Sequence, residues 1–237
     1  GIDRELLPRL AAKLPPTIAA LTINKMCGSG LKAVMLADQA IRAGDVRCIV
    51  AGGMECMSRA PFLLGGVREG WKFGDQPAVD SMIRDGLWCA FENFSMGAEA
   101  DHIAHQCGVS RDSQDTFAVE SQRRAAAAIE AGRFNSEIVA VSVPGRKGET
   151  IVSRDEGPRA ETSLEGLSSL RASFEQQPGV ERTVTAGNAS QLSDGAAAVV
   201  VVDEQTAAGI ESPIKARIVA SATSGVTPKD VFIAPVS

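Results

Sequence analysis

The sequence has 237 residues, of which 44% are hydrophobic and 22% charged, and its net charge is −5. A chain of this length can bury the core of one or two domains, and its acidic balance argues against a nucleic-acid-binding surface. It contains no run of 18 apolar residues, so we expect no membrane span and no export signal.

The cysteines favour a reducing, cytoplasmic setting. Their odd number argues against a disulfide framework, and no Cys-x-x-Cys or Cys/His spacing predicts a metal site. The five are Cys27, Cys48, Cys56, Cys89 and Cys107.

The first 51 residues predict a βαβ unit. Residues 3–13 are typical of the end of a helix, and 19–25 of a strand. The run LKAVMLADQAIRAG (31–44) predicts a helix that is buried on most sides, because its polar residues form one stripe. VRCIVA (46–51) predicts a buried parallel strand. The crossover between the two strands of 19–51 should be right-handed.

The middle of the chain begins with a long irregular region and continues with two helices. Glycines and a proline interrupt every pattern in 57–95, which predicts a functional loop or a subdomain. Helices are expected near 96–107 and 111–131. Ser110 is the expected N-cap of the second helix, and Gly132 should follow its end.

Strand patterns return in the last part of the chain. Residues 137–152 have the form of a hairpin, whereas 153–182 are polar and irregular. TVTAGNASQLSDG (183–195) predicts a strand that leads into a glycine-rich loop. An all-apolar strand at 196–203 comes next, then a short helix, then another strand at 214–223.

The stretch NKMCGSGLKA (24–33) has two chemical interpretations. Its G-S-G-L-K-A fits the dinucleotide-binding pattern, but Gly52 and Gly53 stand where a ribose-binding acid is needed, and Glu55 comes late. The alternative is a reactive thiol: Cys27 lies where a strand meets a helix, and the helix start stabilises a thiolate and an oxyanion. A third possibility is that Cys27 is a small buried apolar residue. The residues alone do not decide among these three interpretations.

Three blocks together closely resemble the thiolases, in particular the acetyl-CoA acetyltransferases: NKMCGSGLKAVMLADQAIRAGD, IVAGGMECMSRAPFLL and TVTAGNASQLSDGAAA. The resemblance implies a layered α-β-α-β-α fold, incomplete here, with an inserted loop domain. It assigns 1–56 and 193–213 to an N-terminal half that lacks its first strand. It assigns 57–192 to the insertion that binds coenzyme A (CoA), and 214–237 to the truncated start of a C-terminal half.

The resemblance also implies an acyltransferase reaction. Cys27 takes an acyl group as a thioester, and a reversible Claisen condensation joins two acetyl-CoA molecules or cleaves a 3-ketoacyl-CoA. The expected substrates are acyl-CoA and CoA with no separate cofactor, in fatty acid metabolism, and the expected assembly is a homodimer or homotetramer. The alternatives are a degradative thiolase of longer chains, a ketoacyl synthase, and a non-catalytic CoA-binding or assembly fragment.

The resemblance further implies a set of contacts to the substrate. Ser190 matches a serine at the pantetheine arm, with two small neighbours, and Arg159 matches an arginine near the phosphates. The alternative for Leu87 and Met96 is core packing, and for Arg159 a solvated charge. The implied contact residues are Ser190, Ala186, Ala189, Leu87, Met96, Ser95 and Arg159.

The sequence departs from the family pattern in three ways. Ser95 replaces a histidine and Gly166 replaces a second contact serine, which makes longer 3-ketoacyl substrates more plausible. The N-E-A-F, G-H-P and C-x-G-G-G blocks that supply the base and a second cysteine are absent. His102 and His105 are expected to be exposed helix residues rather than metal ligands. We therefore expect an internal portion of a longer thiolase, without turnover of its own.

Overall fold

The computed structural model describes residues 14–15, 17–146 and 148–236. The chain divides into two compact units, one of Gly1–Ala60 with Ser193–Thr223 and the other of Pro61–Leu192 with Ser224–Ser237. The helix predicted at 3–13 lies outside the described residues.

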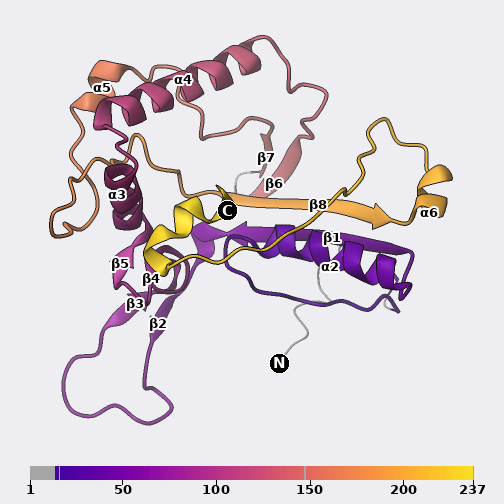
Figure 1. The fold of residues 1–237 in the computed structure, drawn as a ribbon, viewed down its shortest axis with the longest axis horizontal. Coiled ribbons are helices and arrows are strands. Elements are labelled where there is room, and N and C mark those ends of the chain that lie inside the picture. The colour runs from indigo at the N-terminus through magenta and orange to yellow at the C-terminus, as the bar shows by residue number, and fades with distance from the viewer. Residues whose placement is uncertain (1–13, 16, 147, 237) are drawn as a thin grey trace. The chain divides into compact units, whose positions relative to one another are not determined.

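A long two-stranded ribbon forms the centre of the first unit. Strand β1 (Cys48–Cys56) pairs with β8 (Asp194–Val202) in antiparallel register, from Cys48 opposite Val202 to Cys56 opposite Asp194. Helix α2 (Ser29–Ala43) packs on one side of this ribbon (Figure 1). The strand expected at 196–203 and the short helix after it, α6 (Glu204–Ala208), are thereby confirmed.

The helix α2 is confirmed, but its predicted burial is wrong. The helix ends at Gly44, whose φ of 84° lies in the left-handed region that glycine adopts at no steric cost. Ala37 is its buried residue, and Leu31 is 72% exposed. One side of α2 faces the ribbon, so its other apolar side chains stay partly in solvent.

Two predicted strands are absent from the described structure, and the pairing direction predicted for a third is wrong. Residues 19–25 and 214–223 form no strand, apart from an isolated bridge between Lys25 and Cys27. The predicted βαβ unit is therefore absent, and β1 is antiparallel to its partner rather than parallel. Apolar β-forming residues do not specify a partner strand, and without one a run of them gains no ladder hydrogen bonds.

The irregular region at 57–95 contains several short elements instead of one loop. Two small antiparallel pairs occur in it, and a π-helix (Met82–Leu87) lies between them. The strands are β2 (Phe62–Leu64), β3 (Ala78–Asp80), β4 (Trp88–Cys89) and β5 (Phe94–Ser95), and the segment Met57–Arg59 is a 3-10 turn.

The two helices that follow are confirmed. Helix α3 covers Met96–Gln106 and α4 covers Arg111–Glu130. Ser110 caps α4 by accepting a hydrogen bond from the Ser113 N–H at 3.2 Å, and Gly132 after it has a φ of 64°. Short polar side chains at the start and glycine past the end satisfy the unpaired backbone groups of a helix.

The remaining elements of the second unit are short. The expected hairpin is confirmed as β6 (Val141–Gly145) paired with β7 (Gly148–Val152). The polar stretch after it contains α5 (Leu164–Ser168), and a 3-10 segment (Pro228–Val236) packs on α3. Among the described residues, every helix is too short or too polar to cross a membrane.

Candidate functional site

Cys27 lies in a tight turn immediately before α2, and its side chain is exposed. Ser29 ties the two sides of this turn together: its hydroxyl accepts from the Lys25 N–H and donates to the Met26 carbonyl, both at 2.8 Å. Asn24 adds a third bond, because its Oδ1 accepts from the Met26 N–H at 2.9 Å. The turn is thus fixed by its own side chains, and the reading of Cys27 as a buried apolar residue is wrong for this structure.

The residue before the cysteine has an unusual backbone conformation. Met26 has a φ of 49°, in the left-handed region where a side chain is disfavoured. A non-glycine residue held there marks a sharp change of chain direction. The change of direction places Cys27 at the start of the helix, where the N–H groups of Gly28 and Ser29 donate to the Lys25 and Met26 carbonyls at 3.0 and 3.1 Å.

Glycines allow the helix start to approach β1. A Cβ on Gly53 would lie 3.3 Å from Gly30 Cα, which is tighter than an ordinary contact. The Gly52-Gly53 pair therefore has a steric role at the point where a dinucleotide fold needs an acidic side chain. This arrangement favours the thiol interpretation over the nucleotide one.

The second unit carries the loop 183–190, which holds three of the predicted contact residues. Ser190 and Ala186 are exposed and Ala189 is half-buried. Thr185 is fully buried at the base of the loop; its carbonyl accepts from the Ala189 N–H at 3.0 Å, and its Oγ1 accepts from the Gly187 N–H at 3.2 Å. The strand predicted before the loop is reduced to one bridge, between Thr185 and Ala172.

Two buried carboxylates, Asp115 and Asp101, fasten this loop to the helices. Asp115 on α4 accepts from Asn188 Nδ2 at 2.9 Å. Asp101 on α3 accepts from the backbone N–H groups of Thr183 at 2.7 Å and Val184 at 2.9 Å. Buried charges of this kind need such partners, because an unpaired one is costly.

The sequence interpretation missed both carboxylates. The signal for Asp101 is that Ala98, Asp101 and Ala104 recur at intervals of three residues on the buried side of α3. An acid on an apolar stripe indicates a buried partner. For Asp115 the signal is its spacing of four residues from Arg111.

Three further implied contact residues, Leu87, Ser95 and Met96, lie at the ends of two helices. Ser95 is the N-cap of α3: its Oγ accepts from the Ala98 N–H at 3.3 Å and donates to Glu175 Oε2 at 2.5 Å. Met96 follows it in the helix, and Leu87 ends the π-helix; both are half-buried. Ser95 thus has a structural task, and the geometry leaves a contact role for Leu87 and Met96 as a prediction.

Arg159 is exposed and its backbone is anchored. Its N–H donates to Gln122 Oε1 at 2.8 Å, and its carbonyl accepts from Thr162 Oγ1 at 2.8 Å. Within the described residues, no carboxylate forms an ion pair with its guanidinium group. A fixed backbone with an unpaired guanidinium fits an anion-binding role.

The two histidines differ in their surroundings. His105 is exposed as predicted, but His102 is half-buried, with its Nε2 3.6 Å from Asp230 Oδ1. The prediction of exposure is wrong for His102 because the 3-10 segment Pro228–Val236 covers that side of α3. In the part of the chain that the structure describes, no group of three or more His, Cys, Asp or Glu side chains has a metal-binding arrangement.

Comparison with known proteins gives matches in sequence and in fold. A model of the thiolase N-terminal domain matches residues 4–205. The chain is 48% identical over 229 residues to an acetyl-CoA acetyltransferase of Pseudomonas aeruginosa. This match covers 96% of the present chain and 57% of that protein. The chain is 47% identical over 223 residues to a probable acetyl-CoA acetyltransferase of Escherichia coli, covering 94% and 56%.

A solved structure gives the fold. The crystal structure of human mitochondrial 3-ketoacyl-CoA thiolase matches with a TM-score of 0.78 and 35% identity, over 88% of this chain and 53% of that one. The chain thus spans a little more than half the length of its relatives, and its fold is a thiolase-like α/β fold. On the match over residues 4–205, this chain belongs to the thiolase family.

Proposed function

We propose that this chain is part of an acyl-CoA C-acyltransferase that works through an acyl-cysteine intermediate. The thiolate of Cys27 attacks the thioester carbonyl of an acyl-CoA, and the CoA thiolate leaves. The α-carbanion of a second acetyl-CoA then attacks the acyl-cysteine, so that 3-ketoacyl-CoA forms and Cys27 is released. Division of the reaction into two steps is the advantage of covalent catalysis.

The observation that carries this proposal is the exposed thiol of Cys27 immediately before the first turn of α2. Small neighbours leave room beside the sulfur, and the backbone N–H groups of a helix start suit an oxyanion. Relatives named as acetyl-CoA acetyltransferases support an acetyl group as the first acyl unit.

The second unit supplies the CoA contacts in this proposal. The loop 183–190 presents Ser190 beside two alanines, so that a thin pantetheine chain can lie against backbone. The unpaired guanidinium of Arg159 suits a phosphate. Residues 57–192 then correspond to the CoA-binding insertion, 1–56 with 193–213 to the N-terminal half, and 214–237 to the start of the C-terminal half.

The remaining features of the proposal are coarser. A CoA thioester is a substrate, so no separate cofactor is needed. The five free cysteines fit a reducing cytoplasm, and a homodimer or homotetramer in fatty acid metabolism completes the proposal. The serine at position 95, in place of a histidine, favours acceptance of 3-ketoacyl chains longer than acetoacetyl.

Acetyl transfer to Cys27 is the direct test. The full-length protein encoded by this reading frame is incubated with acetyl-CoA and acid-quenched, and the modified cysteine is located by mass spectrometry. One acetyl group on Cys27 is expected, together with its loss in Cys27→Ser and its persistence in Cys48→Ser. Equal and slow modification of both cysteines would favour a non-catalytic CoA-binding fragment.

The chain alone gives a second readout. None of its 237 residues belongs to the family's base or second-cysteine blocks. We therefore expect the isolated chain not to form acetoacetyl-CoA. Formation of acetoacetyl-CoA by the chain alone would show that another residue of this chain is the base.

A further inference from the structure

We propose that Asp115 is a positioning residue for residues 185–190 of the loop 183–190, which it orients through Asn188. This inference rests on the proposed function, since it concerns the loop that contacts CoA there. Asp115 touches no substrate itself: the residue is 1% exposed and lies beneath the loop, on α4.

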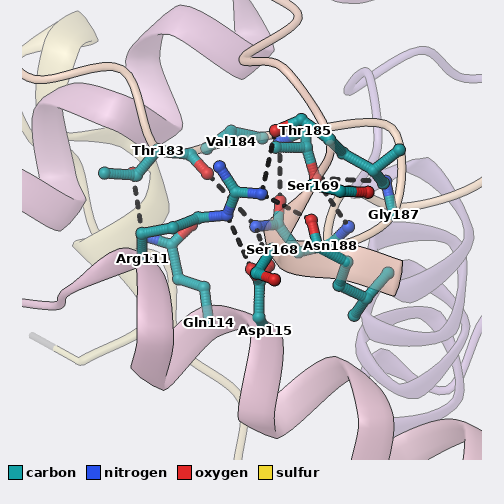
Figure 2. A network of polar contacts seen from close by, with 12 residues as sticks. Arg111, Gln114, Asp115, Ser168, Ser169, Thr183, Val184, Thr185, Gly187 and Asn188 are labelled. Atoms are coloured by element: carbon teal, nitrogen blue, oxygen red, sulfur yellow. Dashed lines mark hydrogen bonds and ion pairs between the residues drawn. The ribbon is translucent and has the colours of Figure 1, made fainter. Parts of the chain in front are cut away.

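Each oxygen of the Asp115 carboxylate has its own partner. Oδ2 accepts from Arg111 Nε at 2.7 Å, and Oδ1 accepts from Asn188 Nδ2 at 2.9 Å (Figure 2). Hydrogen bonds to an ionised group are stronger than neutral ones, so this pairing fixes the carboxylate on both sides.

Arg111 is itself held in place. Its Nη2 donates to the carbonyls of Leu167 at 2.7 Å and Leu170 at 3.1 Å, at the end of α5 and just beyond it. Two carbonyls and one carboxylate thus define the plane of the guanidinium. The carboxylate of Asp115 then has one well-defined direction toward the loop.

Asn188 converts that direction into a loop conformation. Its Oδ1 accepts from the Thr185 N–H at 2.8 Å, while its Nδ2 donates to Asp115 and, at 3.2 Å, to the Thr183 carbonyl. A reversed amide would bring two oxygens together at Asp115 and two donors together at Thr185. The orientation of the amide is therefore determined, and Ala189 and Ser190 follow it directly.

A separate anchor distinguishes positioning from general support. Asp101 on α3 holds the first residues of the loop, Thr183 and Val184, through hydrogen bonds that do not involve Asp115. Loss of the Asp115 contact would leave the loop attached at its start and release the part that carries Ser190. The expected effect is on substrate affinity rather than on the fold.

The test uses Asp115→Asn in the full-length protein. The asparagine keeps the shape of the side chain and removes its charge. The KM for acyl-CoA should rise about tenfold or more, the scale of one lost charge-assisted hydrogen bond. The rate at which iodoacetamide alkylates Cys27 should stay that of the wild type, since Cys27 belongs to the other unit.

Two further variants sharpen the test. Adding Asn188→Asp to Asp115→Asn restores one carboxylate–amide pair in the opposite sense and should recover part of the KM. Glu120→Gln is the control, because Glu120 is another α4 carboxylate paired with arginines, Arg123 and Arg124, and its side chain is 38% exposed. Its KM should equal that of the wild type.

A variant that leaves Asp115 intact guards against misfolding. Asn188→Ala removes the amide and keeps the ion pair with Arg111, and its KM should rise as in Asp115→Asn. An unchanged KM in both variants, with only a lower melting temperature, would overturn the positioning role. A wild type that fails to acetylate Cys27 would contradict the proposed function instead, so the two failures are distinguishable.

Discussion

Gly52 of β1 lies directly against Ala198 of β8. A Cβ on Gly52 would stand 2.9 Å from Ala198 Cα, and still closer to the carbonyl oxygen of Ala197. The backbones of the two strands occupy the space that a side chain would need, so glycine is required here for close approach rather than for an unusual φ.

Gly52→Ala should therefore destabilise the first unit. Forcing a methyl group against backbone costs about 1–3 kcal/mol, because neither strand can move without breaking the ladder. Urea unfolding should show the loss. Gly195→Ala is the matched control in β8, with no atom within 4 Å of its Cβ; an equal loss in both would contradict the steric explanation.

Met26 should tolerate glycine better than its neighbour does. A side chain in the left-handed region destabilises the folded state by about 1–2 kcal/mol through steric contact of its Cβ. Glycine has no Cβ and avoids this contact. Met26→Gly should thus be more stable than Lys25→Gly by about 1 kcal/mol, since Lys25 has no positive φ. Thermal unfolding of the two variants measures the difference, and equal stabilities would mean that Met26 is unstrained.

Asp203 should make the first unit sensitive to acid. A hydrogen bond from Arg47 at 2.6 Å, with two from Thr206, holds the pKa of Asp203 well below its ordinary value. Because the folded pKa is the lower one, the stabilisation is fully present above the unfolded pKa, about 3.9, and is lost as pH falls through the folded pKa.

Asp203→Asn isolates this effect, because asparagine is also a good N-cap and can keep the bond to the Thr206 N–H. The urea midpoint of the wild type should exceed that of the variant at neutral pH, and the gap should narrow below about pH 4. A gap that does not change with pH would assign the effect to packing instead of charge.

Local signals in the sequence correctly predicted the helices at 31–44, 96–107 and 111–131, the short helix α6 and the hairpin. Ser110 and Gly132 act at the two ends of α4 through neighbouring backbone groups, so their effect is readable within a few residues. The exposed turn around Cys27 depends likewise on Asn24 and Ser29, which are close in sequence.

Features that depend on distant partners were not predicted. The pairing of β1 with β8 joins segments separated by more than half of the chain. The apolar pattern within β1 does not indicate which distant strand it pairs with. The contact between Asp115 and Asn188 joins residues that lie 73 positions apart. The sequence TAGNAS (185–190) indicated the loop, whereas the carboxylates beneath it were recognised only in the folded structure.

The strand ends of the ribbon have a consequence for the long segment between them. Asp194 accepts from the Ser58 N–H at 2.9 Å and from its hydroxyl at 2.5 Å, and the bonds from Ser58 lower the pKa of Asp194. The segment between β1 and β8 therefore leaves the ribbon and rejoins it at one point, the Ser58–Asp194 contact, which acts as a clasp. Closing a segment costs free energy that grows only with the logarithm of its length. Evolution could lengthen, shorten or exchange everything beyond this clasp and leave the two strands almost unaffected.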